Sequence, residues 1–588
     1  MKPVSQPAPE SVERPKPGAP RNALCGSDVI ADAIRDLGIE YITVNPGSSF
    51  RGLHDSIVNY LGNEKPQIML CLHEEHAVAI AHGYAKIAGR PMAAAVHSNV
   101  GLMHASMAIY NAYCDRMPVL VIGATGPVDA DKRRAWIDWI HTSQDQGAVI
   151  RNFVKWDDQP NSVMAARESI LRAGWLTSLS PMAPVYVNLD TEIQEQQLTE
   201  ILPLVDAKRF LPRIAIGADG EQCWRTAELL KAATRPLILI GRVGRSRDAW
   251  AQRVQLAEAI GARVVTSRQA GASFPTDHPL HVSSITSISG QPGLPGKEAL
   301  QAIRESDLIL SFDWLDLAGT LKYAFEGAAL PTVIQVSNDY QLHNGWSMEY
   351  FGLPVADEFL ATTPDAAVAE LLRNFPAAGD SQPPVATEIK TPDMSAATIG
   401  LPHLVYALRQ ACGSRSVSLL KAPILWSNAM WPLRDPLDYV GSEGGGGIGA
   451  GPGIAVGGAL ALRGSGRLPI CITGDGDFIM GLTAVWTAVR YRIPLLFVIT
   501  NNQSFYNDEV HQRLMAQRRG RPIENQAIGI EMNDPALNLV KLAEGQGAIG
   551  FGPVEKPADL AAIFDKAIAA VEAGSVSVVD VRTPVDRS

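Results

Sequence analysis

Residues 468–502 read LPICITGDGDFIMGLTAVWTAVRYRIPLLFVITNN, and this stretch decides the fold. It contains two apolar runs with the character of buried strands, separated by helix-like sequence. The first run ends at a Gly-Asp-Gly turn (474–476) and the second at an Asn-Asn pair (501–502). Because strands that alternate with helices form parallel sheets, the stretch predicts two parallel strands whose carboxyl ends share one edge of a sheet.

Asp475 and Asn502 are expected to meet at that edge, where ligands collect in parallel sheets. A carboxylate and a carboxamide oxygen suit Mg²⁺, with diphosphate oxygens and water completing the octahedron. Gly474 and Gly476 let the backbone approach a phosphate closely. Gly-Asp-Gly alone is a common turn, but an Asn pair at a second strand end makes the pattern much more specific. The motif therefore predicts a Mg²⁺–diphosphate site.

The same alternation of strand-like and helix-like sequence continues along the chain. In the first block IEYITVNPG, PMAAAVHS and MPVLVIGATGP read as buried strands, and RPLILIGRVG opens the second block in the same way. We predict an α/β fold of three domains, each with a parallel sheet flanked by helices. The expected limits are a disordered arm at 1–22, domains at 23–200, 219–375 and 399–588, and a linker at 376–398.

Composition and charge exclude several classes of protein. The chain has 588 residues, 46% hydrophobic and 19% charged, which excludes collagen-like, disordered and disulfide-scaffold proteins. Its net charge of −10 does not suit nucleic-acid binding, so no nucleic-acid partner is expected. The chain shows no apolar run of about 18 residues and no secretory signal, so no membrane association is expected. Six scattered cysteines without a CxxC pair predict buried free thiols and a cytoplasmic location.

With these motifs the chain resembles the thiamine-diphosphate-dependent enzymes that include acetolactate synthase, benzoylformate decarboxylase and benzaldehyde lyase. In that family the GDG…NN pattern binds the metal and the diphosphate. The resemblance implies that Asp475, the side chain of Asn502 and the main-chain carbonyl of Ser504 hold Mg²⁺. Gly474 and Gly476 would then lie at the diphosphate. The resemblance covers nearly the whole chain after the arm, in the order pyrimidine-binding, central Rossmann-like and diphosphate-binding domain.

The other half of the cofactor site is expected in IMLCLHEEHAVAIAHGYAKIAG, residues 68–89. The family's chemistry needs a carboxyl group beside a ring nitrogen of the aminopyrimidine in a dry pocket. The family's Glu stands at a strand end, about nine residues before a Gly-Tyr pair, here 83–84. That register assigns the catalytic and cofactor-binding role to Glu74. Glu75 suits the solvated first turn of a helix, where the dipole favours a carboxylate.

A glycine run, GSEGGGGIGAGPGIAVGGALAL at 441–462, precedes an apolar helix. It could be a dinucleotide loop, but no acidic ribose partner stands at the expected distance. The resemblance implies instead that Ile448 props the thiazolium ring and that the carbonyl of Gly446 accepts from the aminopyrimidine. The sequence departs from the family at Pro452-Gly453, where the family has a residue followed by Pro.

Two strand ends supply candidates for the substrate side of the site. Ser48 lies in an Asn-Pro-Gly-Ser turn and resembles a Ser that contacts the substrate carboxylate in benzoylformate decarboxylase; a plain turn is the equal alternative. His97, in a His-Ser pair at another strand end, matches that enzyme's active-site His, and His is the usual proton shuttle near neutral pH. His104 stands where the family often has Asn, which is a departure from the pattern.

A second catalytic His is a weaker candidate. His278 in FPTDHP matches a segment that carries a further active-site His in the decarboxylase, although His-Pro in this family often only shapes a loop. His73 and His141 are additional pocket candidates, without the spacing typical of metal ligands. Four arginines gather at 513–521. They form either a solvated basic loop or an active-site lid that holds an anionic substrate or tail.

The resemblance implies a thiamine-diphosphate- and Mg²⁺-dependent enzyme that cleaves or forms C–C bonds. It would act on a 2-oxo acid or 2-hydroxy carbonyl compound through a C2 ylid and an enamine, as a decarboxylase, carboligase or lyase. The alternatives are an acetolactate-synthase-like transferase, a non-catalytic relative and a nicotinamide dehydrogenase. The central domain shows no clear flavin pattern, so FAD is not expected. Because the family's cofactor bridges two subunits, we expect at least a homodimer, and the resemblance implies a homotetramer.

Overall fold

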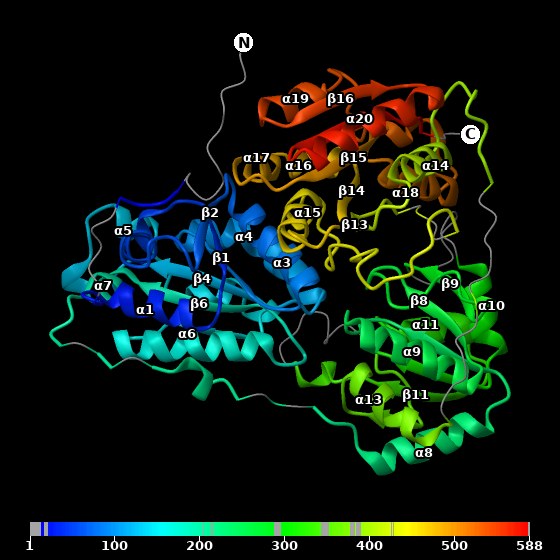
Figure 1. Cartoon of the computed structure of the whole chain (residues 1–588), viewed down its shortest axis with the longest axis horizontal. Coiled ribbons are helices and arrows are strands. Elements are labelled where there is room, and N and C mark those ends of the chain that lie inside the picture. Colours follow the sequence, from blue (N-terminus) through cyan, green and yellow to red (C-terminus); the bar gives the residue numbers. More distant parts are fainter. Residues whose placement is uncertain are drawn as a thin grey trace.

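Three parallel sheets covered by helices follow one another along the chain (Figure 1). This arrangement confirms the predicted α/β class with three domains. Most of the predicted arm and linker falls outside the described residues. The computed structural model describes residues 13–16, 22–200, 202–203, 205–212, 214, 216–286, 296–342, 352–376, 383, 390–424, 426 and 429–585.

The first sheet has the strand order β2-β1-β3-β4-β6-β5, and every neighbouring pair is parallel. Its central strands are apolar and fully buried, as in β3, which reads MAAA. β2 is an edge strand and leads directly into helix α3. The elements are α1 (Gly26–Asp36), β1 (Tyr41–Val44), α2 (Arg51–Asp55), β2 (Gln67–Leu70), α3 (Glu74–Ala88), β3 (Met92–Ala95), α4 (Ser98–Cys114), β4 (Val119–Thr125), α5 (Ile137–Ile140), β5 (Trp156–Asp158), α6 (Val163–Ser178), β6 (Val185–Asp190) and α7 (Thr191–Glu195).

The central sheet has the order β12-β11-β10-β7-β8-β9 and is also parallel throughout. An ion pair joins it to the first domain: Arg116 Nη2 lies 2.8 Å from Oδ2 of Asp339, which stands three residues after β11. The elements are α8 (Gly220–Ala232), β7 (Pro236–Ile240), α9 (Arg247–Ile260), β8 (Arg263–Ser267), β9 (His281–Ile285), α10 (Lys297–Glu305), β10 (Leu308–Phe312), α11 (Leu317–Phe325), β11 (Thr332–Val336), β12 (Glu358–Leu360) and α13 (Pro364–Leu371).

The third sheet has the order β13-β14-β15-β17-β16. β14 and β15 are the two strands predicted from 468–502; they are parallel neighbours, with Gly474 opposite Thr500. The elements are α14 (Leu401–Cys412), β13 (Val417–Lys421), α15 (Ala450–Ala461), β14 (Leu468–Gly474), α16 (Asp475–Met480), α17 (Thr483–Arg490), β15 (Leu495–Asn501), α18 (Tyr506–Arg518), α19 (Leu539–Gly545), β16 (Ile549–Val554), α20 (Leu560–Glu572) and β17 (Val576–Arg582).

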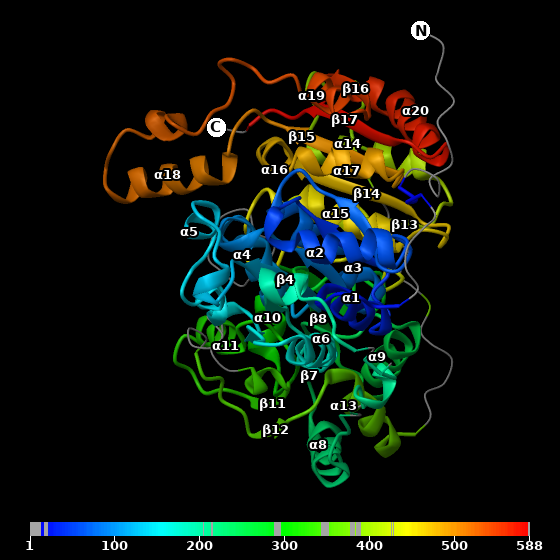
Figure 2. The ribbon, with the colours of Figure 1, turned by 90° about the vertical axis from the view of Figure 1, so that its left-hand side faces the viewer.

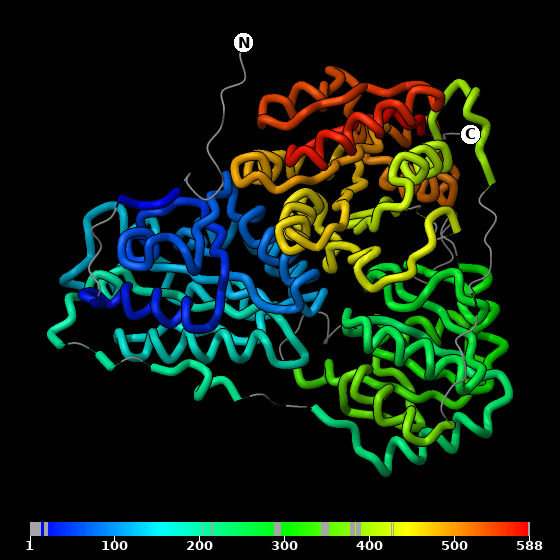
Figure 3. The backbone as a smooth tube through the Cα atoms, in the orientation of Figure 1, coloured from blue at the N-terminus to red at the C-terminus, as the bar shows by residue number. Residues whose placement is uncertain are grey.

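The first and third domains pack against each other through α3 and α15, which lie side by side in Figures 1 and 2. Glycines allow this close approach. A Cβ on Gly83 would lie 1.9 Å from the carbonyl oxygen of Ile454, and one on Gly457 would lie 1.9 Å from that of Ile80. Figure 3 shows that the chain leaves the first domain for the central one and then returns to lie beside the first. Residues far apart in sequence thereby meet at the α3–α15 junction.

α18 projects away from the rest of the third domain (Figure 2). Among the described helices, none is both long and apolar enough to cross a membrane. The six cysteines are all free, as predicted, and four of them are buried.

Candidate active site

Glu74 begins α3 just after edge strand β2, and only 7% of it is exposed. Its carboxylate faces the first turns of α4. A Cβ on Gly101 would lie 3.0 Å from Glu74 Oε1, so glycine at this position leaves room for the carboxylate. The structure therefore holds Glu74 in a buried position between two helix N-termini, as the proposed role in a dry pocket requires.

Imidazole rings surround Glu74. His104 Nδ1 lies 3.2 Å from Glu74 Oε2, and the ring of His73 stacks on that of His104 at a centroid distance of 5.1 Å. These three residues could offer ligand atoms within 4.8 Å of one another. However, His73 Nδ1 accepts from the backbone N–H of Glu75 at 3.1 Å. The proton of neutral His73 is therefore on Nε2, which suits hydrogen bonding rather than metal ligation.

Glu75 and His76 face the third domain instead. His76 Nδ1 lies 2.7 Å from the hydroxyl of Thr483 on α17. Burial, with a smaller effect of His73, lowers the pKa of His76 to about 4, so the ring is neutral. Burial and then Asp477 raise the pKa of Glu75. Glu74 and Glu75 thus differ in their surroundings, and the role of His76 at the junction had no signal in the sequence.

His97 at the end of β3 is the next polar group of the pocket. Its ring lies edge-on to His141 at a centroid distance of 4.5 Å. Burial and then His141 lower the pKa of His97. Its Nδ1 lies 2.8 Å from the hydroxyl of Ser49, not of Ser48. Residues 45–47 form the loop after β1, and Ser49, which follows this loop, supplies the hydroxyl that contacts His97.

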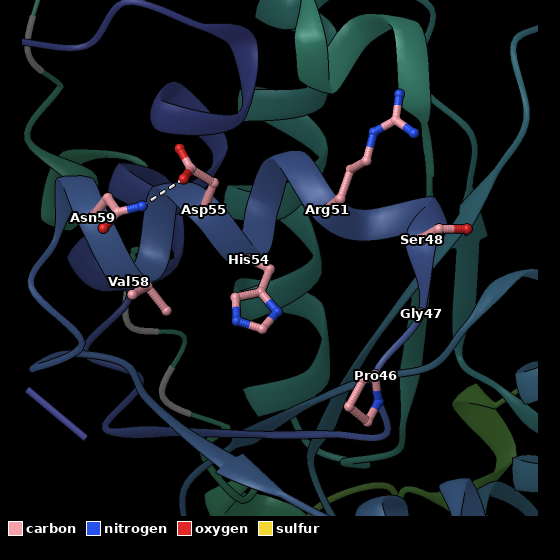
Figure 4. A pocket seen from close by; sticks show the side chains of 8 residues that line it. All are labelled: Pro46, Gly47, Ser48, Arg51, His54, Asp55, Val58 and Asn59. Carbon is pink, nitrogen blue, oxygen red and sulfur yellow. Dashed lines mark hydrogen bonds between the residues drawn. The ribbon is translucent and has the colours of Figure 1, made fainter. Parts of the chain in front are cut away.

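Ser48 is exposed and lines a different feature, a pocket of about 540 Å³ on the outer side of α2. Figure 4 shows Ser48 beside Arg51 and His54 in this pocket. The turn directs the two successive hydroxyls to opposite sides, and this depends on backbone conformation that residue type alone does not specify. Contact of Ser48 with a substrate remains a prediction without support from this geometry.

His278 lies in the central domain with both ring nitrogens engaged. Its Nε2 is 3.0 Å from Glu258 Oε1, and its Nδ1 accepts from the backbone N–H of Leu280 at 3.1 Å. Only 6% of the residue is exposed. The structure does not bring His278 into the histidine cluster around Glu74, and its contacts are those of a residue that shapes a loop.

Asp475 is the best indication of a cation site. It is 4% exposed, and its carboxylate accepts from the backbone N–H groups of Gly476 at 2.9 Å and Gln503 at 2.5 Å. Within the described part of the chain it forms no ion pair. Burial raises its pKa to about 6. A buried carboxylate without a cation is unfavourable, so the arrangement suits a metal ion.

Asp477, two residues later, differs from Asp475 because its carboxylate has a cationic partner. Its Oδ2 lies 3.1 Å from Lys421 Nζ, and its Oδ1 accepts from the backbone N–H of Gly449 at 2.6 Å. Burial alone would raise the pKa of Asp477, but Lys421 and a hydrogen bond from Thr473 bring it below its usual value. Asp477 therefore joins the metal motif to the glycine-rich loop as a structural group.

Asn502 and Ser504 follow β15 at the same edge as Asp475. Asn502 Oδ1 accepts from the backbone N–H of Ser504 at 2.9 Å. Gln503 between them has φ +58°, a left-handed conformation that tightens the turn. Asp475 contacts this turn through Gln503, so the structure brings the three predicted metal ligands to one place.

The glycine-rich loop lies against α4 of the first domain. A Cβ on Gly447 would lie 2.5 Å from the side chain of Met107, and Ile448 keeps 44% of its surface exposed. A Cβ on Gly446 or Gly474 would meet no described atom within 4 Å. Gly446 and Gly474 thus face open space, where a diphosphate-bearing cofactor would fit. Gly476 does not, because a Cβ there would lie 2.6 Å from the ring of Phe505.

The domains that carry the two halves of the predicted site contact each other within the chain. The loop contacts α4, which also carries His104, and α3 packs on α15 directly after the loop. The sequence predicts that the halves come from two subunits. That expectation stays a prediction; within one chain, glycine pairs allow the first and third domains to pack directly.

An exposed tryptophan pair precedes His141 in the chain and was missed from the sequence. Trp136 and Trp139 are 70% and 77% exposed, with ring centroids 5.9 Å apart. Trp136 has φ +69° and ψ −63°, an unusual backbone conformation. Asp138 between them accepts from Arg134, including its backbone N–H at 2.6 Å. His141 directly follows this turn, so a WxxW spacing next to a pocket His was the available signal.

The arginine segment lies on and after α18. Among the described residues, none of its four arginines forms an ion pair; they are Arg513, Arg518, Arg519 and Arg521. Both the solvated-loop and the lid interpretations remain open for this segment.

Comparisons with known proteins agree with the site. Three family models match in order: the N-terminal TPP-binding domain of thiamine pyrophosphate enzymes at residues 25–149, their central domain at 224–344 and their C-terminal TPP-binding domain at 423–581. The chain belongs to the thiamine pyrophosphate enzyme family. Asp475, Asn502 and the glycine-rich loop lie inside the C-terminal match, and Glu74 inside the N-terminal one.

Several family members resemble the whole chain. The acetolactate synthase large subunit of Haemophilus influenzae is 23% identical, over 90% of this chain and 89% of that protein. Benzoylformate decarboxylase of Pseudomonas aeruginosa is 25% identical, over 81% of this chain and 85% of that protein. The structure of a 4-hydroxybenzoylformate decarboxylase from Rhodococcus jostii covers 96% of this chain, and all of that chain is covered, at 22% identity and a TM-score of 0.76. The fold is therefore that of thiamine pyrophosphate enzymes throughout.

Proposed function

We propose that the chain catalyses C–C bond cleavage or formation on a 2-oxo acid or 2-hydroxy carbonyl compound, with thiamine diphosphate and Mg²⁺. One observation carries this proposal. Glu74 is buried among imidazoles in the first domain, and the third domain holds the buried carboxylate of Asp475, without an ion pair among the described residues, beside backbone at Gly446 and Gly474 that faces open space. The retention of both groups also disfavours a non-catalytic relative.

The residues divide the work as follows. Asp475, the side chain of Asn502 and the main-chain carbonyl of Ser504 would hold Mg²⁺, and the open backbone at Gly474 would admit the diphosphate. When bound, thiamine diphosphate supplies a nucleophilic carbon that attacks the substrate carbonyl. Glu74 would hold a proton at the aminopyrimidine ring nitrogen, and burial of Glu74 excludes water from that contact.

The glycine-rich loop would orient the cofactor. Its Gly446 carbonyl would accept from the aminopyrimidine, and Ile448 would support the ring that carries the reacting carbon. His97 would hold or move a proton at the substrate, because burial and His141 keep it neutral near pH 7. The polar histidines suit the carboxylate or hydroxyl of a 2-oxo acid or 2-hydroxy ketone.

The tryptophan pair favours an aromatic or bulky apolar substituent on the substrate. Trp136 and Trp139 offer exposed aromatic surface on the turn that precedes His141, and stacking on such rings stabilises planar groups. Two of the relatives are named for aromatic substrates, benzoylformate and 4-hydroxybenzoylformate. An acetolactate-synthase-like transferase is the second candidate, supported by the similarity to acetolactate synthase.

We propose that the protein assembles at least as a homodimer, with a homotetramer as the larger form. α18 and the segment after it project from the body (Figure 2), and this projection is the surface proposed to contact another copy. Light scattering on purified protein would measure the mass.

A substrate screen tests the proposed function. Purified protein with thiamine diphosphate and Mg²⁺ is supplied with pyruvate, aromatic 2-oxo acids, 2-hydroxy ketones and 2-hydroxyacyl thioesters, and products are identified by mass spectrometry. We expect turnover of an aromatic 2-oxo acid above that of pyruvate, lost in Glu74→Gln. Turnover without the cofactor, or full turnover in Glu74→Gln, would contradict the proposal. Reduction of NAD(P)⁺ would favour a dehydrogenase instead.

A further inference from the structure

Glu13 of the N-terminal arm lies between the first and third domains. It enters a cavity of about 250 Å³ whose walls include Tyr41 and Gln67 of the first domain and Arg490 and Tyr491 of the third. Its Oε1 lies 2.5 Å from Arg490 Nη2 and 3.1 Å from Nε. Its Oε2 accepts from the hydroxyl of Tyr491 at 2.9 Å. The arm therefore contributes a charged group to the contact between the first and third domains.

The hydroxyl of Tyr491 connects Glu13 to strand β2. It accepts from the backbone N–H of Leu70 at 2.7 Å, while the backbone carbonyl of Leu70 accepts from the hydroxyl of Thr487 at 3.1 Å. β2 is an edge strand, so the outward-facing polar groups of Leu70 need partners outside the sheet. The end of α17 supplies both partners, and Glu13 holds one of them in place.

Leu70 is the last residue of β2 and stands four positions before Glu74. The chain of contacts thus runs from Glu13 through Tyr491 and Leu70 to the strand end that delivers Glu74. A shift of this strand end would move Glu74 and the carboxylate that is proposed to act on the cofactor. Placement errors of about 1 Å at a reacting group are enough to slow a reaction strongly.

The arm is held to the first domain at the same time. The backbone carbonyl of Glu13 accepts from Asn63 Nδ2 at 3.0 Å, and Arg14 Nη1 donates to the backbone carbonyl of Asn63 at 3.2 Å. Arg14 also pairs with exposed Glu64 at 3.5 Å. The main chain of this segment is therefore fastened to one domain and its carboxylate to the other.

We propose that Glu13 is a positioning residue of the active site: it fixes Tyr491 and, through it, the strand end that carries Glu74. The proposal rests on the proposed function. A surface ion pair with no such role is the competing interpretation, and such pairs are worth little. Glu13 differs because its side chain is only 20% exposed and also bonds a neutral hydroxyl.

The first test needs no cofactor. Hydrogen–deuterium exchange of the peptide that contains Leu70 is measured in the apo protein for wild type, Glu13→Ala and Glu13→Gln. Loss of a hydrogen bond to a charged group is expected to speed exchange of the Leu70 amide about tenfold in Glu13→Ala. Glu13→Gln keeps an acceptor for Tyr491 and is expected to lie closer to wild type. Glu64→Ala, the matched control on the same arm contact, should leave exchange unchanged.

The second test uses saturating thiamine diphosphate and Mg²⁺, and follows exchange of the cofactor's C2 proton in D₂O by NMR. Glu13→Ala is expected to slow this exchange about tenfold and to lower kcat with KM unchanged, while Glu64→Ala matches wild type. Tyr491→Phe should slow it similarly, without an additive loss in the double variant. Unchanged exchange at both the Leu70 amide and the cofactor in Glu13→Ala would overturn the proposal. If Glu74→Gln also leaves C2 exchange unchanged, the proposed function itself fails.

Discussion

Replacement of Asp475 by Asn tests two effects of this carboxylate at once: that it binds the metal, and that it destabilises the folded apo protein. The carboxylate of Asp475 is buried, accepts only backbone N–H groups and forms no ion pair among the described residues. Without a cation, the folded protein therefore bears an uncompensated charge. Asp475→Asn removes this charge with little change of shape, and is expected to stabilise the apo protein while it abolishes Mg²⁺-dependent cofactor binding.

The size of the effect follows from the pKa. Burial raises the pKa of Asp475 from 3.8 to about 6, which corresponds to about 3 kcal/mol of unfolding free energy lost at neutral pH. Because the folded-state pKa is the higher one, this stability is present below pH 3.8 and is lost as pH rises through about 6. In the variant, the amide nitrogen of Asn faces one backbone N–H that has lost its acceptor, which lowers the unfolding free energy by about 1 kcal/mol. The net gain is about 2 kcal/mol, or about 5 °C in Tm for a unit the size of the third domain.

The assay is thermal unfolding of metal-free protein at pH 7.5 and pH 5, with and without Mg²⁺ and thiamine diphosphate. Asp475→Asn should raise the apo Tm at pH 7.5, raise it less at pH 5, and abolish the further rise that Mg²⁺ and cofactor give wild type. Asp477→Asn is the matched control. It should lower the apo Tm, because it removes one ion-pair partner of buried Lys421. An apo Tm that falls equally in both variants would refute the reasoning.

Three further outcomes are expected. His141→Asn should move the acid limb of the kcat/KM profile toward higher pH, because burial and then His141 lower the pKa of His97; an unmoved limb would exclude His97 as the titrating group. Trp139→Ala should raise KM several-fold for an aromatic 2-oxo acid and leave KM for pyruvate unchanged, and equal effects on both would argue against stacking. His104→Asn should keep cofactor affinity but change C2-proton exchange, since His104 contacts Glu74 directly; identical exchange rates would show that the contact has no effect.

The fold could be predicted from the sequence because the apolar strands and the residues at their ends form local patterns. The two apolar runs of 468–502 became β14 and β15 in the expected parallel register, and the strand-end residues Asp475 and Asn502 came together as predicted. Glu74 was found from its spacing to a glycine that packs against another helix. A Cβ at that glycine, Gly83, would overlap the backbone of Ile454, so the spacing reflects a packing requirement.

The parts that sequence did not predict depend on backbone direction and on distant contacts. The hydroxyl on His97 belongs to Ser49 because the turn directs Ser48 outward. His278 is held by Glu258 within its own domain, a contact that no local pattern indicates. The bond from Glu13 to Tyr491 joins residues 478 positions apart, and only the packed domains bring them together.

The most direct measurement is the exchange rate of the C2 proton of thiamine diphosphate bound to this protein with Mg²⁺, compared with Glu74→Gln. It needs no knowledge of the substrate. Exchange much faster than in free cofactor, and lost in Glu74→Gln while that variant still binds the cofactor, is the expected result. Exchange at the rate of free cofactor in the wild type, or equal rates in the two proteins, would contradict the assignment of Glu74 and Asp475 to one cofactor site.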